Sequence, residues 1–528
     1  MIFSHITEQA GEVASIAMPL DYQQDPLSCY QQLAATSSCS LLLESAEIDS
    51  KDNLKSLMLI DVALRIECIG SVVTLRAISP NGATLLPFLA EKLQTEASVE
   101  LDSEQLVVRY AEADPLLDEV SRLQVPNPFS VLRRIRTELV SQSDEAFAVF
   151  LGGVIGYDMV ANVEQLPEVP TGDNQCPDYL FYLAETMMVM DHQAKTSKVL
   201  GNVFCGEQAL ANCFAIGKRL EQLKQLAQQG HRFQPGTPTS SEAVATVDIS
   251  DETFKQQVVQ LKQHIVCGDI FQVVPSRCFQ LPCPNPLTAY ARLKQLNPSP
   301  YMFFMQDQAF TLFGASPESA LKFDANNRQV EIYPIAGTRR RGFHADGRID
   351  PDLDSRIELE LRQDEKEKAE HLMLVDLARN DVARIAVPGS RYVKELLKVD
   401  RYSYVMHLVS RVIGTLKPEL DALHAYQACM NMGTLVGAPK VKAAELVRYV
   451  EKKRRGSYGG AVGYLTGQGD FDSCIVIRSA YVQDGIASIQ AGAGVVFDSD
   501  PQAEADETRN KAQAVIKAIQ TADALEKL

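Results

Sequence analysis

The stretch QAGAGVVFDSDPQAEADET, residues 490–508, decides much of how this chain folds. It opens in a β-rich run that ends in small residues. Asp500-Pro501 then predicts the start of a helix, because aspartate is a good N-cap and proline suits the first helical position. Glu504 and Glu507 follow at once. Three residues span close to one helical turn, so both carboxylates project from one helix face.

A second pair with the same spacing, Glu367 and Glu370, lies in DEKEKAEHLMLVDLARND, residues 364–381. Two such faces brought together form a box of hard oxygen ligands, which suits a divalent cation, most plausibly Mg²⁺. The alternative is a pair of solvated acidic surfaces, because charged side chains are normally exposed.

Length and charge bound the class of protein. With 528 residues, the chain predicts two or three domains, or one large enzyme with two closely packed parts. A hydrophobic fraction of 46% indicates a folded globule. The net charge of -17 and a pI near 5.1 disfavour nucleic acid or an anionic membrane as the main partner.

The cysteines and the N-terminus bear on the cellular compartment of the protein. None of the eleven cysteines forms a Cys-x-x-Cys pair, and their spacings match neither zinc nor disulfide frameworks. The first residues lack a basic region followed by an apolar core, and the longest uncharged apolar stretch, residues 147–157, is too short to span a bilayer. We expect a soluble cytoplasmic protein with reduced thiols and no membrane partner.

Composition divides the chain into two halves. Gly, Pro, Ser and Thr cluster at residues 229–246, which we interpret as a linker. Residues 1–228 show no obvious catalytic arrangement, so a binding or regulatory role suits them. Residues 247–528 then form the catalytic region.

Local patterns predict several elements. Strands are expected at 40–44 and 71–78, and a helix at 251–266 behind a cap at Ser250 or Asp251. Near the C-terminus, runs at 457–465, 473–482 and 486–491 predict an antiparallel meander with turns at 467–470 and 484–485.

The meander carries a candidate anion site. Small residues at 492–494 let a ligand approach backbone N–H groups. Arg478 is expected within the strand 473–482, on a face shared with Cys474, Val476 and Ala480. Beside the glycines it would clamp a carboxylate, whereas an exposed arginine is the alternative.

Several motifs in order resemble those of the chorismate-utilising enzymes, and most closely the large (component I) subunits of anthranilate synthases. The resemblance covers nearly all of residues 250–515 and rests on Pro334-Ile-Ala-Gly-Thr-Arg339, Gly314-Ala-Ser-Pro-Glu318, residues 364–381, Gly437-Ala-Pro-Lys440 and residues 490–508. It implies an α+β fold in which antiparallel β-sheets pack together with helices outside.

The resemblance assigns roles position by position. Glu370 and Glu507 match direct magnesium ligands, and Glu367 and Glu504 match ligands that act directly or through water. Glu318 matches the general acid, which would need a raised pKa, and His407 matches an active-site histidine. The positions that match chorismate contacts are Gly337, Thr338, Tyr458, Arg478, Gly492, Ala493 and Gly494. Among these we expect Thr338 to act in catalysis as well.

Two positions choose the reaction. Relatives that add water to chorismate carry a lysine base where this chain has Gln272, and relatives that make aminodeoxychorismate carry a nucleophilic lysine where it has Ala336. The resemblance therefore implies that ammonia attacks chorismate directly, and that loss of pyruvate then gives anthranilate. An aminodeoxychorismate synthase large subunit and a catalytically inert tryptophan-sensing homologue are the alternatives.

Segments 41–45 and 51–55 resemble the tryptophan-binding segment of bacterial members, which implies feedback inhibition. A structural seam between the halves is the alternative reading of the same residues. The expected inhibitor contacts are Glu44, Ser45, Lys55, Asn297, Pro300, Tyr301, Met302 and Cys474.

No cysteine lies in a Gly-x-Cys-x-Gly glutaminase motif, so ammonia should come from a separate glutamine amidotransferase subunit. The resemblance implies a heterotetramer of two large and two small subunits.

Overall fold

The computed structural model describes residues 6–45, 54–112, 114, 116–230, 232–236, 243–344, 346–402 and 405–522. Its helices are α1 (Pro26–Leu33), α2 (Pro80–Ala83), α3 (Leu85–Leu93), α4 (Glu119–Gln124), α5 (Phe129–Glu138), η2 (a 3₁₀ helix, Tyr157–Asn162), α6 (Ala209–Gln228), α7 (Asp251–Val266), α8 (Pro286–Leu296), α9 (Pro351–Gln363), α10 (Glu365–Ile385), α11 (Ala422–Cys429), α12 (Gly433–Val436), α13 (Lys440–Glu451) and α14 (Pro501–Gln520).

The strands of the first half are β1 (Glu12–Leu20), β2 (Ser40–Glu44), β3 (Lys55–Ile69), β4 (Val72–Ala77), β5 (Ser98–Leu101), β6 (Gln105–Arg109), β7 (Val140–Ser141), β8 (Phe150–Ile155), β9 (Tyr179–Asp191) and β10 (Thr196–Phe204). Those that follow are β11 (Thr246–Val247), β12 (Gln272–Val273), β13 (Ser276–Pro282), β14 (Tyr301–Gln306), β15 (Thr311–Ser316), β16 (Ser319–Asp324), β17 (Gln329–Ile332), β18 (Ile335–Arg340), β19 (Tyr392–Arg401), β20 (Val405–Thr415), β21 (Gly437–Ala438), β22 (Ala461–Thr466), β23 (Phe471–Ile475), β24 (Ser479–Gln483) and β25 (Ile486–Gly492).

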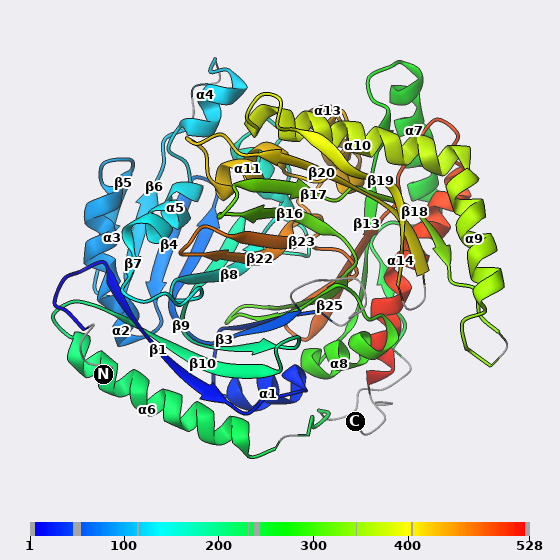
Figure 1. Ribbon diagram of the computed structural model, residues 1–528. Coiled ribbons are helices and arrows are strands. Elements are labelled where there is room, and N and C mark those ends of the chain that lie inside the picture. The colour runs from blue at the N-terminus through cyan, green and yellow to red at the C-terminus, as the bar shows by residue number, and fades with distance from the viewer. Residues whose placement is uncertain are drawn as a thin grey trace.

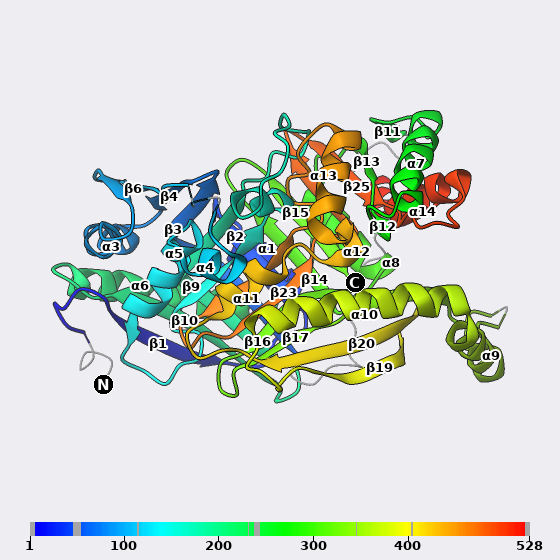
Figure 2. The same cartoon turned by 90° about the horizontal axis from the view of Figure 1, so that it is seen from above.

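Strands occupy the middle of the molecule and helices cover its outside (Figure 1). In the described part of the chain, 23 strands form one hydrogen-bonded network, and β12 pairs separately with β21. One hydrophobic core packs α5, α10 and α11 onto the strands, and another packs α1, α6, α8 and α14. Figure 2 shows α10 lying along β20 and β19. The predicted α+β fold with antiparallel strands inside and helices outside is confirmed.

The two halves of the sequence share this network. Strand β2 pairs with β14, so that Glu44 lies opposite Met302, and β8 pairs with β22. The proposed division at residues 229–246 stays a prediction, and positions 231 and 237–242 of that segment lie outside the described residues. The ladders nevertheless show that both halves build one body, because backbone hydrogen bonds cross between them.

Several predicted elements form as expected. Helix α7 begins behind Ser250, whose side chain accepts a hydrogen bond from Thr253 N–H, and α14 begins behind Asp500 with proline at its start. Asp484 and Gly485 both have positive φ, which suits the tight turn between β24 and β25. The predicted strand 40–44 is β2, and 71–78 shortens to β4.

The predicted strand 473–482 is wrong, and the reason concerns the candidate site residue Arg478. Residues 473–482 do not form one strand, because Arg478 has φ 49° and separates β23 from β24. A left-handed residue breaks the alternation of an extended chain, so Arg478 shares no strand face with Cys474 and Ala480. The expected strand 457–465 likewise starts only at Ala461, which leaves Tyr458 in the preceding turn.

No helix in the described part of the chain combines the length and the apolar character that crossing a bilayer would require.

Candidate active site

Two helix N-termini present the paired glutamates. The Asp364 side chain caps α10 by accepting hydrogen bonds from Lys366 and Glu367 N–H, and the Asp500 side chain caps α14 by accepting one from Ala503 N–H. Each cap sets where its helix begins. Each Glu-x-x-Glu pair therefore lies within the first two turns of its helix.

The four carboxylates influence one another across the two helices. Burial raises the pKa of Glu370, and the charges of Glu367 and Glu507 raise it further. Burial also raises the pKa of Glu504, as does Glu507. Because Glu507 acts on a carboxyl of each helix, the two pairs belong to one acidic site.

These residues fit a hard cation by their chemistry. They supply oxygen ligands, and partly buried like charges favour a cation that would neutralise them. Glu367 accepts a 2.7 Å hydrogen bond from Arg339, and Glu507 forms a 2.5 Å ion pair with Lys511. Among the described residues, no three His, Cys, Asp or Glu side chains stand together at metal-binding spacing. A cation would therefore compete with two protein cations for these carboxylates.

Gln272 orients one carboxylate. Its amide Nε2 donates a 2.8 Å hydrogen bond to Glu370 Oε1, and the Gln272 side chain is buried. Strand β12 is held against Gly437, which has φ 122° and where an added Cβ would lie 2.1 Å from the Gln272 carbonyl oxygen. A Cβ at Gly494 would lie 2.8 Å from Gln272 Nε2. Glycine is therefore required at both positions for this amide to reach Glu370.

Thr338 and His407 form a hydrogen-bonded pair. They lie opposite each other on β18 and β20, and Thr338 Oγ1 is 2.8 Å from His407 Nδ1. The register shifts between Ala336 and Thr338, where Gly337 has φ 80°. This bulge aims Thr338 at the histidine. Burial and the nearby Arg478 charge lower the pKa of His407 to about 4, so the ring is neutral at neutral pH.

Arg478 interacts electrostatically with several of the candidate site residues. It is half-buried, and besides lowering the pKa of His407 it interacts electrostatically with Tyr458, Glu507 and Glu318. Its left-handed backbone directs the guanidinium inward, where Nη1 donates to the Lys511 carbonyl oxygen at 3.3 Å. Burial lowers the pKa of Arg478 against the opposing effect of Tyr458, Glu507 and Glu318. An added carboxylate would be a natural partner for it.

Glu318 has the properties of an acid. It lies in the turn between β15 and β16 and is 7% exposed. Burial raises its pKa to about 8, although Thr434, Lys511 and Arg478 oppose the shift. Thr434 Oγ1 donates to Glu318 Oε1 at 3.1 Å. The group is therefore mostly protonated at neutral pH and can donate a proton.

Sequence reasoning missed Lys511 and Thr434. Lys511 Nζ donates to the Gly492 carbonyl oxygen at 3.0 Å and acts on Glu318, Glu370 and Glu504. Its position four residues after Glu507 was the available signal, because i and i+4 side chains meet on a helix. No pattern in the sequence singled out Thr434.

The run 492–494 is only partly available to a ligand. Ala493 N–H donates to the Pro275 carbonyl oxygen at 3.1 Å, so that donor is already used. A Cβ at Gly492 would lie 3.0 Å from the Tyr458 hydroxyl oxygen. The glycine thus leaves room for the tyrosine, whose pKa burial raises to about 12.

The expected inhibitor residues gather at the β2–β14 ladder. Glu44 is buried, accepts 2.6 Å hydrogen bonds from Tyr290 Oη and Lys294 Nζ, and lies opposite Met302. Extending the β2–β3 register by two positions sets Ser45 opposite Lys55. Tyr290 and Lys294 on α8 were not foreseen.

The remaining expected inhibitor residues lie in the second half. Asn297 ends α8, Tyr301 begins β14 just after Pro300, and Tyr301 packs with the core around Cys474. Lys51, Asp52 and Asn53 of the second matching segment lie outside the described residues.

Comparison with known proteins identifies the family. The model of the chorismate binding enzyme family matches residues 89–517. The chain belongs to this family. It is 59% identical over 501 residues to anthranilate synthase component 1 of Vibrio cholerae, covering 95% of each chain, and 56% identical to that of Escherichia coli K12, covering 95% of this chain and 96% of the relative.

Solved structures agree. Anthranilate synthase component I of Streptococcus pneumoniae superposes with a TM-score of 0.66 at 29% identity, covering 89% of this chain and 93% of the other. A menaquinone-specific isochorismate synthase from Escherichia coli shares the fold, with a TM-score of 0.67 at 16% identity over 98% of this chain and 97% of the other. The resemblance seen in the sequence motifs is thereby confirmed.

The effect of the Arg478 charge should be measurable as a change in the pKa of His407. We expect Arg478→Met to raise the pKa of His407 above about 4, because a positive neighbour disfavours the imidazolium. Selective ¹³C labelling of histidine and an NMR pH titration, with His407→Gln to assign the signal, would measure it. His371 is an internal control, because its pKa, also about 4, is set by burial and a backbone contact without Arg478. An unchanged His407 pKa would contradict the conclusion that the Arg478 charge lowers it.

Proposed function

We propose that this chain converts chorismate and ammonia to anthranilate, pyruvate and water, as the synthase subunit of an anthranilate synthase. The observation that carries the choice of product is Gln272, an amide committed to Glu370 where a lysine base would be needed to activate water. Ala336 likewise offers no nucleophile. The names of relatives at 50–59% identity support the same reaction.

The site suits a substrate with two carboxylates and a leaving hydroxyl group. Arg478 would take one carboxylate through its guanidinium, and Lys511 would add positive charge beside Gly492. Bound in this way, the ring presents C2 to ammonia and the 4-hydroxyl to an acid. Attack at C2 expels the 4-hydroxyl with a shift of the ring double bonds.

Glu318 would protonate the departing hydroxyl, so that it leaves as water. Its pKa near 8 keeps the proton available at neutral pH, and the Thr434 hydrogen bond fixes the carboxyl. The aminated intermediate then loses the enolpyruvyl side chain as pyruvate and the proton at C2, and the ring becomes aromatic. Neutral His407, held by Thr338, would lie beside the ring as a hydrogen-bonding partner.

We include Mg²⁺ in the proposal, with Glu370 and Glu507 as direct ligands and Glu367 and Glu504 as direct or water-bridged ones. When bound, the ion would supply positive charge for the second carboxylate of the substrate. The raised pKa values of Glu370 and Glu504 support this assignment, because a cation relieves the same repulsion.

Ammonia is proposed to come from a glutamine amidotransferase subunit in a complex of two large and two small subunits. All eleven cysteines are free thiols, and ten of them are buried. Cys267 is exposed and lies at the C-terminal end of helix α7. No hydrogen bond in the described part joins it to a base. The free thiols also support a cytoplasmic location.

Feedback inhibition by tryptophan completes the proposal. Glu44, with Tyr290 and Lys294, would receive the polar end of the amino acid where β2 meets β14. Tryptophan can inhibit there only if it binds the inactive arrangement more tightly than the active one.

The product assay tests the reaction directly. Purified chain with chorismate, Mg²⁺ and an ammonium salt should form fluorescent anthranilate and pyruvate in equal amounts. Glu370→Gln and Glu507→Gln should abolish this while far-UV circular dichroism stays unchanged, and Glu100→Gln, an exposed carboxylate 67% accessible on β5, is the matched control. Isochorismate or free aminodeoxychorismate as the sole product would refute the assignment.

The role of Glu318 as the general acid predicts how kcat depends on pH. Since the folded-state pKa of Glu318 is about 8, we expect kcat, referenced to free ammonia, to fall as pH rises through that value. Glu318→Gln should lower kcat by about 10²–10⁴-fold and abolish this alkaline limb. If Glu318→Gln kept the same fall in kcat at high pH, that fall would come from the titration of another group.

The inhibitor site has a matched pair of variants. Ser45→Leu and Glu44→Gln should raise the tryptophan concentration for half-inhibition at least about tenfold, the loss expected for one charged hydrogen bond, with kcat nearly unchanged. Glu67→Gln, in the Arg65 ion pair on neighbouring β3, should leave inhibition intact. Unaltered inhibition in both site variants would exclude this location.

A further inference from the structure

One cavity lies apart from the predicted catalytic residues. Its volume is about 490 Å³, and it lies between α5, the residues just before α11, the β16–β17 turn and the β22–β23 turn. None of the predicted catalytic, metal or inhibitor residues lines it. Strand β16 runs from this cavity, at Phe323, to Glu318, five residues or roughly 17 Å away at ~3.3 Å per residue.

The cavity is basic in an acidic protein. Its charged lining consists of Glu96, Arg133, Arg134, Arg136, Arg328, Glu419 and Asp421. Four guanidiniums against three carboxylates leave +1 with His424 neutral, whereas the whole chain carries -17. Arg134 is already compensated, because it forms ion pairs with Glu96 and Glu138.

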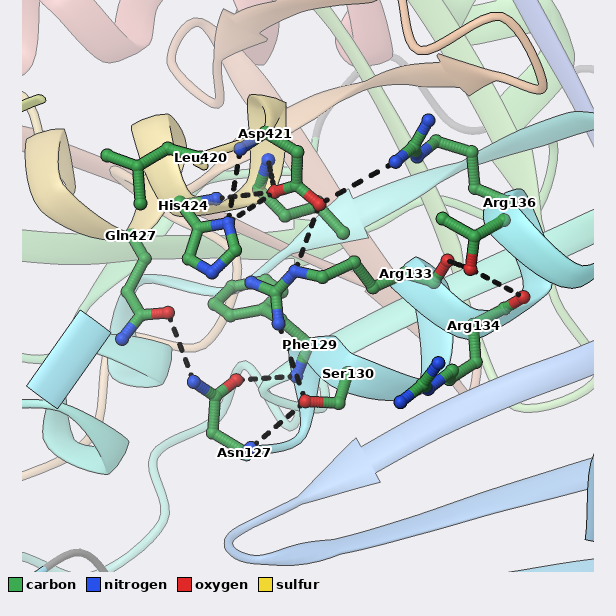
Figure 3. A network of polar contacts seen from close by, with 12 residues as sticks. Asn127, Phe129, Ser130, Arg133, Arg134, Arg136, Leu420, Asp421, His424 and Gln427 are labelled. Carbon is green, nitrogen blue, oxygen red and sulfur yellow. Dashed lines mark hydrogen bonds and ion pairs between the residues drawn. The ribbon is translucent and has the colours of Figure 1, made fainter. Parts of the chain in front are cut away.

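Arg133 and Arg136 share a single carboxylate. Both reach from α5 toward Asp421, which caps α11 (Figure 3). Arg133 Nε donates to Asp421 Oδ2 at 3.1 Å, and Arg136 Nη2 is 3.9 Å from the same oxygen. That carboxylate also contacts His424 Nδ1 at 2.8 Å. Within the described residues, Arg133 Nη2 is buried without a hydrogen-bond partner.

Arg328 lines the same cavity, and no carboxylate among the described residues forms an ion pair with it. Its Nη2 donates to the carbonyl oxygens of Lys417 and Leu420 at 2.7 Å each, and its Nε to that of Leu416 at 3.4 Å. These bonds fix the guanidinium but bring no negative charge. Burial lowers the pKa of Arg136, and Arg133 and Arg328 lower it further against the effect of Asp421. Glu419 forms no ion pair in the described part of the chain, so Asp421 is the one carboxylate there that pairs with any of these three guanidiniums.

We propose that this cavity binds a small metabolite through an oxyanion group, a carboxylate or a phosphate, held by Arg133, Arg136 and Arg328. Planar guanidiniums bind either group in a bidentate manner. The volume lies in the range of small-molecule sites and exceeds what a bare oxyanion needs, so the group is carried on an organic body. The ligand is not the substrate, because the cavity is separate from the acidic site.

Isothermal titration of the full chain at constant ionic strength, with pyrophosphate and citrate as probes, tests this. We expect one anion per chain to bind, and the preferred probe distinguishes phosphate from carboxylate chemistry. Arg136→Gln should weaken binding at least about tenfold, as for one lost charged hydrogen bond. Arg356→Gln is the matched control, because it makes the same charge change on exposed α9, where Arg356 pairs with Asp352.

A second variant keeps every arginine. Ala325 and Arg136 both lie next to Gly469. A Cβ added at Gly469 would be 3.6 Å from Ala325 Cβ and 3.4 Å from Arg136 Nη1. Ala325→Glu would therefore place a carboxylate beside Arg136. It should block anion binding without lowering the melting temperature. Binding of neither probe, wild-type affinity in both cavity variants, or an equal loss in Arg356→Gln would overturn the proposal.

Discussion

The partial burial of four carboxylates, together with their mutual repulsion, is the constraint on which the site depends. Glu370 and Glu504 are withdrawn from water beside other acids, and each therefore has a raised pKa. The protein offsets this repulsion with specific partners: Gln272 on Glu370, Arg339 on Glu367 and Lys511 on Glu507. Such an arrangement costs stability, and carboxylates with perturbed pKa values of this kind are typical of functional sites.

The same charge balance separates the two ends of the reaction site. Glu318 is surrounded by Arg478 and Lys511, which favour its ionised form, yet burial dominates and the proton stays. His407 experiences the same Arg478 charge and loses its proton instead. A single guanidinium, that of Arg478, thus acts on both a neutral acid and a neutral imidazole. The raised pKa is what a carboxyl needs to act as a general acid near neutral pH, whereas the lowered pKa of His407 keeps its ring a neutral hydrogen-bonding group.

Local signals in the sequence were sufficient for the helix caps and for the placement of the acidic pairs. Asp500-Pro501 predicted the start of α14, and Ser250 the start of α7, because a cap depends on only a few neighbouring residues. The roles of Glu318 and His407 came instead from motif resemblance, and the structure adds their burial. The broken strand at Arg478 was missed, because an apolar alternation does not reveal a single left-handed residue.

What sequence could not show are contacts between segments far apart in the chain. The hydrogen bond from Gln272 to Glu370 spans 98 positions, and that from Lys294 to Glu44 spans 250. The arginine cavity is the extreme case: Arg133 and Arg136 belong to one helix of the first half, but their carboxylate, Asp421, lies 288 positions beyond Arg133. On a helical pattern alone these arginines are ordinary solvated charges. Only the packing of α5 against the start of α11 makes them a site, because it removes water from guanidiniums that have too few anions.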